Sequence, residues 1–214
     1  MTSGVAVLGA GGHAKVVIAT LQAAGLTPTL VLDDDRRTWG RTLLGVAVRG
    51  PIESLRDSGC SRAVAALGDN RERERVVAQV ESRGAVNWVT VVHPAAWVHE
   101  SVQLGAGTVV FAGAVLQPDA VVGRHAILNT AATVDHDCRL GDCVHLAPGA
   151  HLAGNVTVGD GGFVGIGSAV LPGIEIGAWA CVGAGAVVVS KVAPATVVAG
   201  VPARAREPQK SQAP

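Results

Sequence analysis

The sequence predicts a two-part fold, an α/β N-terminal half-Rossmann domain followed by an all-β parallel β-helix. The first observation behind this prediction is an apolar run near the N-terminus that leads through a glycine turn into a helical stretch. The second is a six-residue repeat of aliphatic side chains over the C-terminal half. We therefore assign residues 1–91 to the α/β part, residues 92–193 to the β-helix and residues 194–214 to a C-terminal extension.

The N-terminal part reads as strand, glycine turn and helix, with Val5–Leu8 before the glycines of 9–14 and a helix to Ala24. Strands are also expected at Thr29–Leu32 and Arg62–Leu67, and a charged helix at Arg71–Arg83. Ligands of open parallel sheets lie at the carboxyl ends of such strands, and a helix N-terminus offers free N–H groups to a phosphate. Because about 90 residues hold only one mononucleotide-binding half, we expect a nucleotide-sugar rather than NAD. Glycines that merely close a strand-to-helix turn are the alternative.

The repeat places an aliphatic residue at every sixth position, and a small residue usually follows four positions later. Six is the period of a parallel β-helix, in which each rung stacks on the last at about 4.8 Å and buries its aliphatic residue in a continuous core. The seventeen aliphatic positions are Val92, Val98, Leu104, Val110, Leu116, Val122, Leu128, Val134, Leu140, Leu146, Leu152, Val158, Val164, Val170, Ile176, Val182 and Val188.

Glycine follows the aliphatic residue at positions 105, 123, 141, 159 and 177, a spacing of 18 residues. Three six-residue rungs therefore make one coil, and the cross-section is predicted to be triangular. The repeat alone leaves open a rigid scaffold without chemistry, so a catalytic function has to come from residues at the corners.

Composition excludes several classes of partner. Seventeen basic residues balance seventeen acidic ones, so we expect no nucleic-acid partner and no anionic membrane partner. No basic start with a long apolar run is found, and no apolar segment reaches the roughly 18 residues of a membrane span, which favours a cytoplasmic location. The four cysteines form no C-x-x-C pair and are expected to be free thiols. Residues 206–214 are polar and are predicted to be a frayed tail.

His136 is the strongest catalytic candidate from the residues alone. It lies two residues after the inward Val134, in the turn region of its rung, between Asp135 and Asp137. An adjacent carboxylate can fix the tautomer of an imidazole and stabilise its charged form. We therefore predict that His136 is a general base for an amine or hydroxyl that attacks a thioester. An exposed, solvated corner histidine is the alternative.

The other histidines receive weaker predictions. His145 and His151 precede inward leucines, so we expect both to point outward and to line a groove between subunits, with His145 as a secondary substrate or cofactor contact. His93 and His99 belong to the first rungs and are expected to cap the core. His13 follows the glycines, where it faces a phosphate or sugar or serves as a capping or packing residue. Cys138 falls at an inward position and neither it nor Cys143 has a base beside it, so a thiol nucleophile is not expected.

A metal site is a further alternative, because trimeric β-helices can hold Zn²⁺ between subunits through three imidazoles. Such a site, as in gamma-class carbonic anhydrases, needs two histidines in one rung and a third about two coils away. His99 and His136 have a suitable separation, but Gly141 stands where the remaining ligand is needed. We therefore predict no metal.

Motifs spread over nearly the whole chain, from Val5 to about Arg204, resemble a known family. They are Gly9–Val17 (GAGGHAKVV), Leu32–Asp35, Gly68–Asn70, Val92–Pro94, Asn129–Asp137 (NTAATVDHD), His145, Ala153–Asn155, Gly165–Gly167 and Gly200–Arg204. In these motifs the chain resembles the sugar acyltransferases of the sialic acid O-acetyltransferase (NeuD-type) group, a branch of the left-handed β-helix hexapeptide transferases. Members similar to this chain N-acetylate 4-amino sugars on nucleotide carriers, using acetyl-CoA, as trimers.

The resemblance implies a left-handed β-helix and a homotrimer with active sites between subunits, with acetyl-CoA and a nucleotide-sugar as substrates. It implies His136 as general base and Asp137 as the acid that orients it. Donor contacts are implied near the thioester and the pantetheine arm, at His145, the Gly154 N–H, Ile166 and Ala184. Position 184 is glycine in relatives, which weakens the expectation of a backbone contact there. Substrate contacts are implied at Gly11, Gly12, His13, Asp34, Asp35, Asn70 and Asn129.

Three functions stay open from the sequence. The leading one is acetyl-CoA-dependent N-acetylation of the 4-amino group of a nucleotide-linked 4-amino-6-deoxy sugar, such as GDP-perosamine or a UDP-4-amino sugar. Sugar O-acetylation would use the same base, and a non-enzymatic, nucleotide-binding trimeric scaffold would use none. The sequence does not decide among UDP, GDP and dTDP as carrier.

Overall fold

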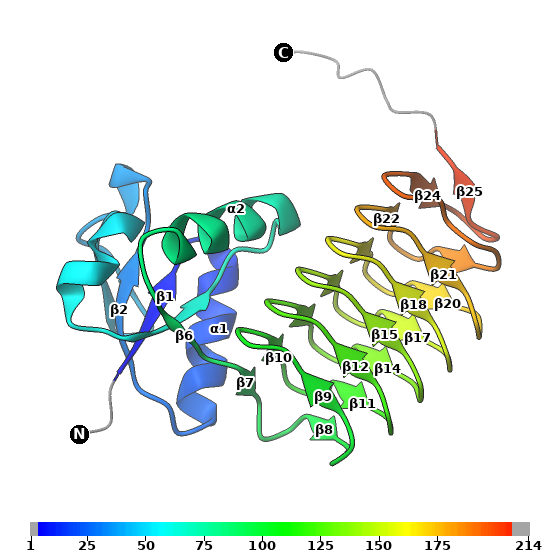
Figure 1. Ribbon diagram of the computed structural model, residues 1–214, viewed down its shortest axis with the longest axis horizontal. Helices are drawn as coiled ribbons and strands as arrows, with labels where there is room; N and C mark the ends of the chain where they lie inside the picture. The colour runs from blue at the N-terminus through cyan, green and yellow to red at the C-terminus, as the bar shows by residue number, and fades with distance from the viewer. Residues whose placement is uncertain (1–3, 207–214) are drawn as a thin grey trace.

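A computed structural model describes residues 4–206, and Figure 1 shows two parts side by side. An α/β layer comes first, and a parallel β-helix follows from residue 91 onward. Both parts of the predicted fold class are confirmed. Most of the predicted tail, residues 207–214, lies outside the described residues.

The α/β layer is a six-stranded sheet in the order β3-β4-β2-β1-β5-β6, parallel except for the β3–β4 hairpin. The predicted strand, glycine turn and helix are present, whereas the β3–β4 hairpin, both 3-10 helices and β6 were not predicted. The strands are β1 (Val5–Leu8), β2 (Pro28–Leu32), β3 (Thr42–Leu43), β4 (Val46–Gly50), β5 (Arg62–Ala65) and β6 (Asn87–Trp88). The helices are α1 (Gly12–Ala23), α2 (Asn70–Glu81) and the 3-10 helices η1 (Arg36–Thr38) and η2 (Ile52–Ser58).

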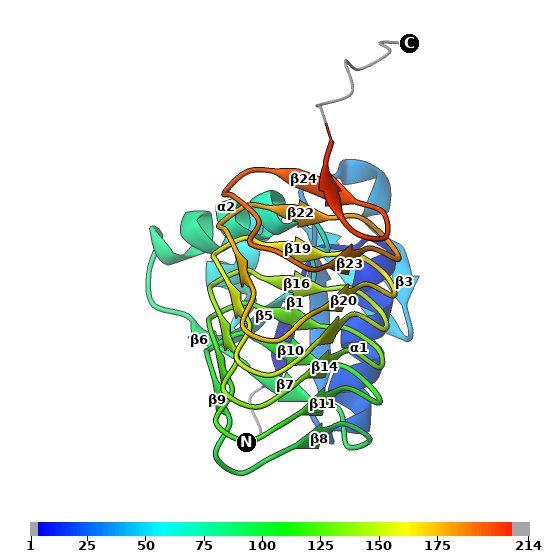
Figure 2. The ribbon, with the colours of Figure 1, turned by 90° about the vertical axis from the view of Figure 1, so that its right-hand side faces the viewer.

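The β-helix consists of three parallel sheets, whose stacked rungs are visible in Figure 2. We call them the docking sheet, the second sheet and the third sheet. The docking sheet holds β7 (Val91–Val92), β10 (Val109–Val110), β13 (Ile127–Leu128), β16 (His145–Leu146), β19 (Phe163–Val164), β22 (Cys181–Val182), β24 (Val197–Ala199) and β25 (Arg204–Ala205). The second sheet holds β8 (Trp97–Val98), β11 (Val115–Leu116), β14 (Thr133–Val134), β17 (His151–Leu152), β20 (Ala169–Val170) and β23 (Val187–Val188). The third sheet holds β9 (Gln103–Leu104), β12 (Val121–Val122), β15 (Arg139–Leu140), β18 (Thr157–Val158) and β21 (Glu175–Ile176).

The seventeen aliphatic positions of the six-residue repeat, here called the aliphatic ladder, form the core of the β-helix. From Val110 to Val188 every member of the ladder is buried, and small residues such as Ala126 and Ala150 fill the spaces between them. Val92, Val98 and Leu104 in the first coil are only partly buried, because no earlier coil covers that end. The six-residue period therefore identified the inward side chains correctly.

The 18-residue glycine spacing has a steric cause. A Cβ atom at Gly105, Gly123, Gly141, Gly159 or Gly177 would lie closer than 3.0 Å to the backbone of the next coil. Backbone atoms cannot move aside without shifting the whole stack. Glycine is thus required where successive coils approach most closely, whatever its backbone torsions.

Three columns of corners connect the sheets. Corner 1 joins the third sheet to the docking sheet (123–126 in one coil), corner 2 joins the docking sheet to the second (129–132), and corner 3 joins the second to the third (135–138). Each column repeats a left-handed residue every 18 positions, exemplified by His125 (φ 54°), Ala131 (φ 56°) and Asp137 (φ 60°). By this connectivity, corner 3 lies opposite the docking sheet.

The α/β layer packs on the docking sheet. Outward Val109 and Ile127 share one buried cluster with Val17 and Ile18 of α1. Figure 1 shows the second and third sheets turned away from the α/β layer. Apolar burial between α1 and the first coils thus stabilises the contact between the two parts.

Helix α2 is attached to corner 1 by one buried arginine. Arg73 is 1% exposed, and its Nε donates to the His125 carbonyl oxygen (2.8 Å) while its Nη2 donates to that of Cys143 (2.7 Å). Its Nη1 donates to the Leu67 carbonyl oxygen at 2.9 Å. Burial lowers the pKa of Arg73 to about 10, so the guanidinium remains charged at neutral pH. One side chain therefore ties the loop after β5 to two coils.

Neighbouring residues of α2 extend this attachment along the same corner. The Asn70 side-chain amide donates to the carbonyl oxygens of Gly161 (3.0 Å) and Gly162 (3.2 Å) in a further coil. The Arg71 guanidinium carbon lies 4.5 Å from the centre of the Trp179 ring. These contacts continue the attachment upward along corner 1.

Membrane insertion by these helices finds no support in the described residues. Between residues 4 and 206, neither α-helix has the length and hydropathy that crossing a bilayer requires.

We predict that Arg73→Ala lowers the free energy of unfolding by about 3–5 kcal/mol, because buried carbonyl oxygens lose their donors and a cavity remains. Arg71→Ala, in the same helix, removes only an exposed cation–π contact and is expected to cost about 0.5–1 kcal/mol. Urea unfolding of both variants measures the difference. Equal losses for the two variants would show that the buried guanidinium has no special role.

A second prediction concerns pH. His125 is 2% exposed, and burial lowers its pKa to about 4. The unfolded chain takes up this proton near pH 6.5 and the folded chain only near pH 4, so stability is lost as pH falls through that window. Replacing His125 by Asn, which also tolerates a left-handed backbone, should reduce the stability lost between pH 7.5 and 4.5 by roughly 2 kcal/mol. Urea unfolding at both pH values measures this loss, and an equal loss in His125→Asn and in the unsubstituted protein would contradict the prediction.

Candidate functional site

The predicted catalytic pair lies together at corner 3. His136 Nδ1 is 2.8 Å from Asp137 Oδ2, and both side chains are about three-fifths exposed, at 61% and 60%. The His136 backbone N–H donates to Asp135 Oδ1 at 2.7 Å. Two acidic neighbours therefore hold the histidine, one through its ring and one through its backbone.

The tautomer of His136 follows from its partner. An ionised carboxylate only accepts hydrogen bonds, so Nδ1 carries the proton and Nε2 has a free lone pair in the neutral ring. The hydrogen bond to Asp137 raises the pKa of His136 above its ordinary value of 6.5. This arrangement is chemically suited to accept a proton at Nε2 and to stabilise the resulting cation.

Gly154 lies one coil beyond His136 at the same corner and is buried, with the imidazole beside its Cα atom. In the described part of the chain, no hydrogen bond involves the Gly154 N–H. A free backbone donor therefore lies close to the edge of the imidazole that carries Nε2.

The thiols are poorly placed for nucleophilic chemistry. Cys138 is fully buried, and its Sγ donates to the Ala153 carbonyl oxygen at 3.2 Å. Burial raises the pKa of Cys138 and of Cys143, so both are further from the reactive thiolate form than an ordinary cysteine.

The structure corrects the prediction that His145 points into a groove between subunits. Its side chain does point outward from the β-helix, but the α/β layer covers it, leaving 7% exposed. His145 Nδ1 is 3.1 Å from the Gly68 carbonyl oxygen, so Nδ1 donates and Nε2 accepts from Asn129 Nδ2, also at 3.1 Å. Burial lowers the pKa of His145 to about 4. His145 is thus a neutral residue at the interface of the two parts of one chain.

Burial also affects His13, which follows the glycine turn. Its ring centre lies 5.4 Å from that of Phe111 and 6.1 Å from that of His145. Burial lowers its pKa to about 4, and among the described residues its Nε2 atom has no hydrogen-bond partner. Buried ring nitrogens without a partner are uncommon in folded proteins.

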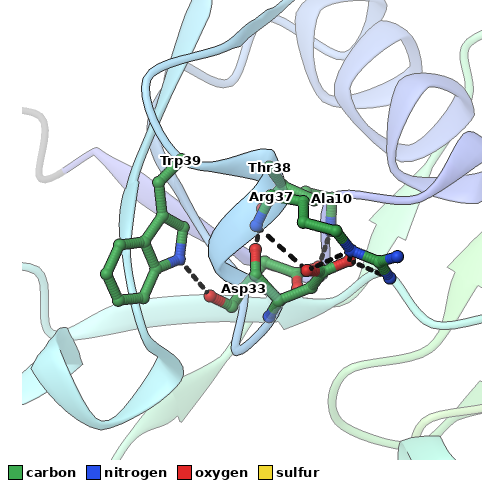
Figure 3. Close-up of polar contacts among 6 residues, drawn as sticks. Ala10, Asp33, Arg37, Thr38 and Trp39 are labelled. Carbon is green, nitrogen blue, oxygen red and sulfur yellow. Dashed lines mark hydrogen bonds and ion pairs between the residues drawn. The ribbon is translucent and has the colours of Figure 1, made fainter.

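The carboxyl end of β2 holds three consecutive aspartates, and Figure 3 shows the contacts around Asp33. Asp33 Oδ2 accepts from the Ala10 N–H at 2.6 Å and thereby connects this loop to the glycine turn. Asp34 Oδ1 accepts from the Ile52 N–H at 2.9 Å. Asp35 is paired with Arg37, whose hydrogen bonds lower the pKa of Asp35. The sequence motif Leu32–Asp35 includes Asp33, but only Asp34 and Asp35 were predicted as substrate contacts.

The glycine turn leaves the N-terminus of α1 accessible. Gly11 and Gly12 are exposed, and Gly11 makes no side-chain cap to the helix. Asn70, predicted as a substrate contact, instead uses its amide group on Gly161 and Gly162 and is buried. Arg73, which organises this region, was not predicted because a single arginine in a charged helix carries no distinguishing signal.

The predicted site residues form two separate groups within one chain. Gly11, Gly12, His13 and Asn129 lie beside the docking sheet and corner 2, and exposed Ile166 and Ala184 lie on the same corner in later coils. His136, Asp137 and Gly154 lie on corner 3, on the far side of the triangle. One chain therefore does not bring the predicted base to the predicted acceptor site.

Metal ligands do not cluster within residues 4–206, where no group of three or more His, Cys, Asp and Glu side chains is arranged to hold an ion.

We predict that Asp137→Asn lowers the pKa of His136 toward 6.5, because the carboxylate that stabilises the imidazolium is lost. Titration of the His136 ring signals by NMR measures this pKa. Asp119→Asn is the matched control, since Asp119 (φ 63°) occupies the same corner position one coil earlier. An unchanged pKa in Asp137→Asn would mean that the hydrogen bond does not form in solution.

The family model described as PglD N-terminal domain matches residues 4–80. Among curated proteins, UDP-N-acetylbacillosamine N-acetyltransferase of Bacillus subtilis (strain 168) is 38% identical over 111 residues, which are 50% of this chain and 51% of that protein. The chain thus spans about half the length of this curated relative.

Solved structures match almost the whole chain. A variant of perosamine N-acetyltransferase from Caulobacter crescentus, in complex with CoA and GDP-perosamine, is 43% identical with a TM-score of 0.91, covering 96% of this chain and 97% of that one. The acetyltransferase domain of PglB from Neisseria gonorrhoeae FA1090, in complex with acetyl coenzyme A, is 37% identical with a TM-score of 0.89, covering 96% and 100%.

Proposed function

We propose that this chain, which belongs to the family of nucleotide-aminosugar N-acetyltransferases, transfers the acetyl group of acetyl-CoA to a nucleotide-linked 4-amino-6-deoxy sugar. The acceptor is the 4-amino group of that sugar. The observation that carries the proposal is the exposed His136–Asp137 pair at corner 3. The relatives supply the class of substrate, and this pair supplies the base that such a reaction needs.

The reaction proceeds by direct attack. The sugar amine forms a bond to the thioester carbon while neutral His136 Nε2 accepts a proton from the nitrogen. The C–S bond then breaks and releases CoA as a thiolate, to which the proton can return. Asp137 stabilises the imidazolium formed in between. No covalent enzyme intermediate is required, in agreement with the raised pKa values of the buried thiols.

The carbonyl oxygen of the thioester gains negative charge during this attack. The Gly154 N–H, unpaired within the described residues and adjacent to the His136 ring, is suited to donate to that oxygen. Base and donor on successive coils of one corner would then serve the same attack, the base at the amine nitrogen and the donor at the thioester oxygen.

The acceptor's nucleotide is assigned to the α/β layer. The exposed glycine turn at the N-terminus of α1 offers N–H groups and a positive dipole end to the diphosphate. His13 directly follows this turn, and we assign its Nε2, which has no hydrogen-bond partner among the described residues, to a contact with a sugar or phosphate oxygen. Asp34 and Asp35 lie at the neighbouring strand end, where acceptors for a nucleobase are expected.

A second copy of the chain completes the site in this proposal. The base lies at corner 3 and the predicted acceptor residues lie beside corner 2, so another subunit has to bring one group to the other. A homotrimer with three equivalent active sites, each between a corner 3 and a neighbouring corner 2, satisfies this requirement. Exposed Ile166 and Ala184 would then face the donor's pantetheine arm.

The acceptor group distinguishes this proposal from sugar O-acetylation. The Bacillus and Caulobacter relatives are both named as N-acetyltransferases, which favours an amine. The sialic acid O-acetyltransferase type suggested by the motifs therefore stays an expectation of the sequence alone.

A thiol-release assay with acetyl-CoA and a panel of nucleotide-linked 4-amino and hydroxyl sugars tests the proposal. We expect turnover with a 4-amino acceptor and a fall of about 10²–10⁴-fold in His136→Ala. The control is His99→Ala, which lies two coils before His136 and removes a ring that is hydrogen-bonded to Ser101. This variant should keep the turnover rate of the unsubstituted protein. Strict preference for hydroxyl acceptors would contradict N-acetylation, and failure of acetyl-CoA to bind by calorimetry would indicate a scaffold.

A further inference from the structure

We propose that Gly154 is a positioning residue, which by lacking a side chain provides the surface on which the His136 imidazole lies with Nδ1 toward Asp137. The inference rests on the proposed role of His136 as base. It assigns to Gly154 a steric role that is separate from any hydrogen bond of its N–H.

A Cβ atom built on Gly154 would lie 2.6 Å from His136 Nε2, 2.7 Å from Cε1 and 3.2 Å from Cδ2. Carbon atoms in contact are ordinarily separated by about 3.5–4.0 Å. The imidazole therefore occupies the space of the missing side chain, and it contacts Gly154 through the edge that carries the proton-accepting nitrogen.

Backbone torsion does not explain the glycine. Gly154 does not have a left-handed φ, unlike the neighbouring corner residue Asn155 (φ 58°). The same place in the other coils carries a side chain each time, namely Glu100, Pro118, His136, Pro172 and Ser190. Glycine stands only in the coil directly after the histidine, so the requirement comes from the ring and not from the corner.

The consequence of a side chain follows from which group can move. Most of the glycines along corner 1 contact backbone, whereas Gly154 contacts the end of a side chain that is 61% exposed. An added methyl group would push the imidazole outward and leave the fold in place. Because alanine keeps its backbone N–H, the proposed donor to the thioester would also be retained. Only the position of the base relative to Asp137 and the substrate would change.

The test is Gly154→Ala in the full-length protein, measured by steady-state kinetics and by NMR titration of the His136 ring. A displacement of about 1 Å is expected to lower kcat on the order of 10²-fold. KM for acetyl-CoA should change little, and the pKa of His136 should fall as the bond to Asp137 weakens. Ser190→Ala places the same methyl group at the same corner position two coils later, and both its rate and the His136 pKa should match the unsubstituted protein.

An unchanged kcat together with an unchanged His136 pKa in Gly154→Ala would overturn the inference. If the variant proves unstable, the double variant His136→Ala/Gly154→Ala decides. Restored thermal stability without the ring supports the contact with the imidazole, and an equal loss of stability would place the clash in the backbone. Failure of the proposed role of His136 can be distinguished from failure of this inference. In that case His136→Ala would release CoA as fast as the unsubstituted protein, whatever the NMR titration of Gly154→Ala shows.

Discussion

The buried guanidinium of Arg73 is the interaction on which the arrangement of the two parts depends. It is charged, 1% exposed, and satisfied by backbone carbonyl oxygens from the loop after β5 and from two coils of the β-helix. A charge can be buried only where such acceptors surround it, so the α/β layer has a defined seat on corner 1. The apolar contact of α1 with the docking sheet adds free energy without this directional requirement.

The position of the α/β layer on the β-helix determines which residues are available for chemistry. Because the α/β layer covers the docking sheet, His145 is buried and neutral, and Asn70 is used for attachment. Corner 3, opposite the covered sheet, keeps His136 accessible. A triangular β-helix with one covered side therefore separates the acceptor site from the base, and our proposal of an intersubunit site follows from that separation.

The histidines of this chain differ in pKa because their surroundings differ. Burial, together with the nearby positive charge of Arg73, lowers the pKa of His13, His125 and His145 to about 4. Exposure beside Asp137 raises the pKa of His136. Near neutral pH the buried rings therefore act as uncharged packing and hydrogen-bonding groups, while His136 is able to take up a proton during catalysis. Steric constraints act beside charge. Glycine is required at position 154 and along corner 1 because neighbouring atoms occupy the space of a side chain.

The sequence by itself determined the β-helix, its inward side chains and the His136–Asp137 pair. Each of these depends on residues that are adjacent or regularly spaced, since coils pair 18 residues apart and the pair is formed by neighbours. The predicted assignments of His145 and Asn70, and the omission of Arg73, were decided only by tertiary structure. Arg73 and Cys143 are separated by 70 residues and share no period. Which side of the β-helix is covered depends on how two independently formed surfaces fit together, and no local pattern encodes that fit.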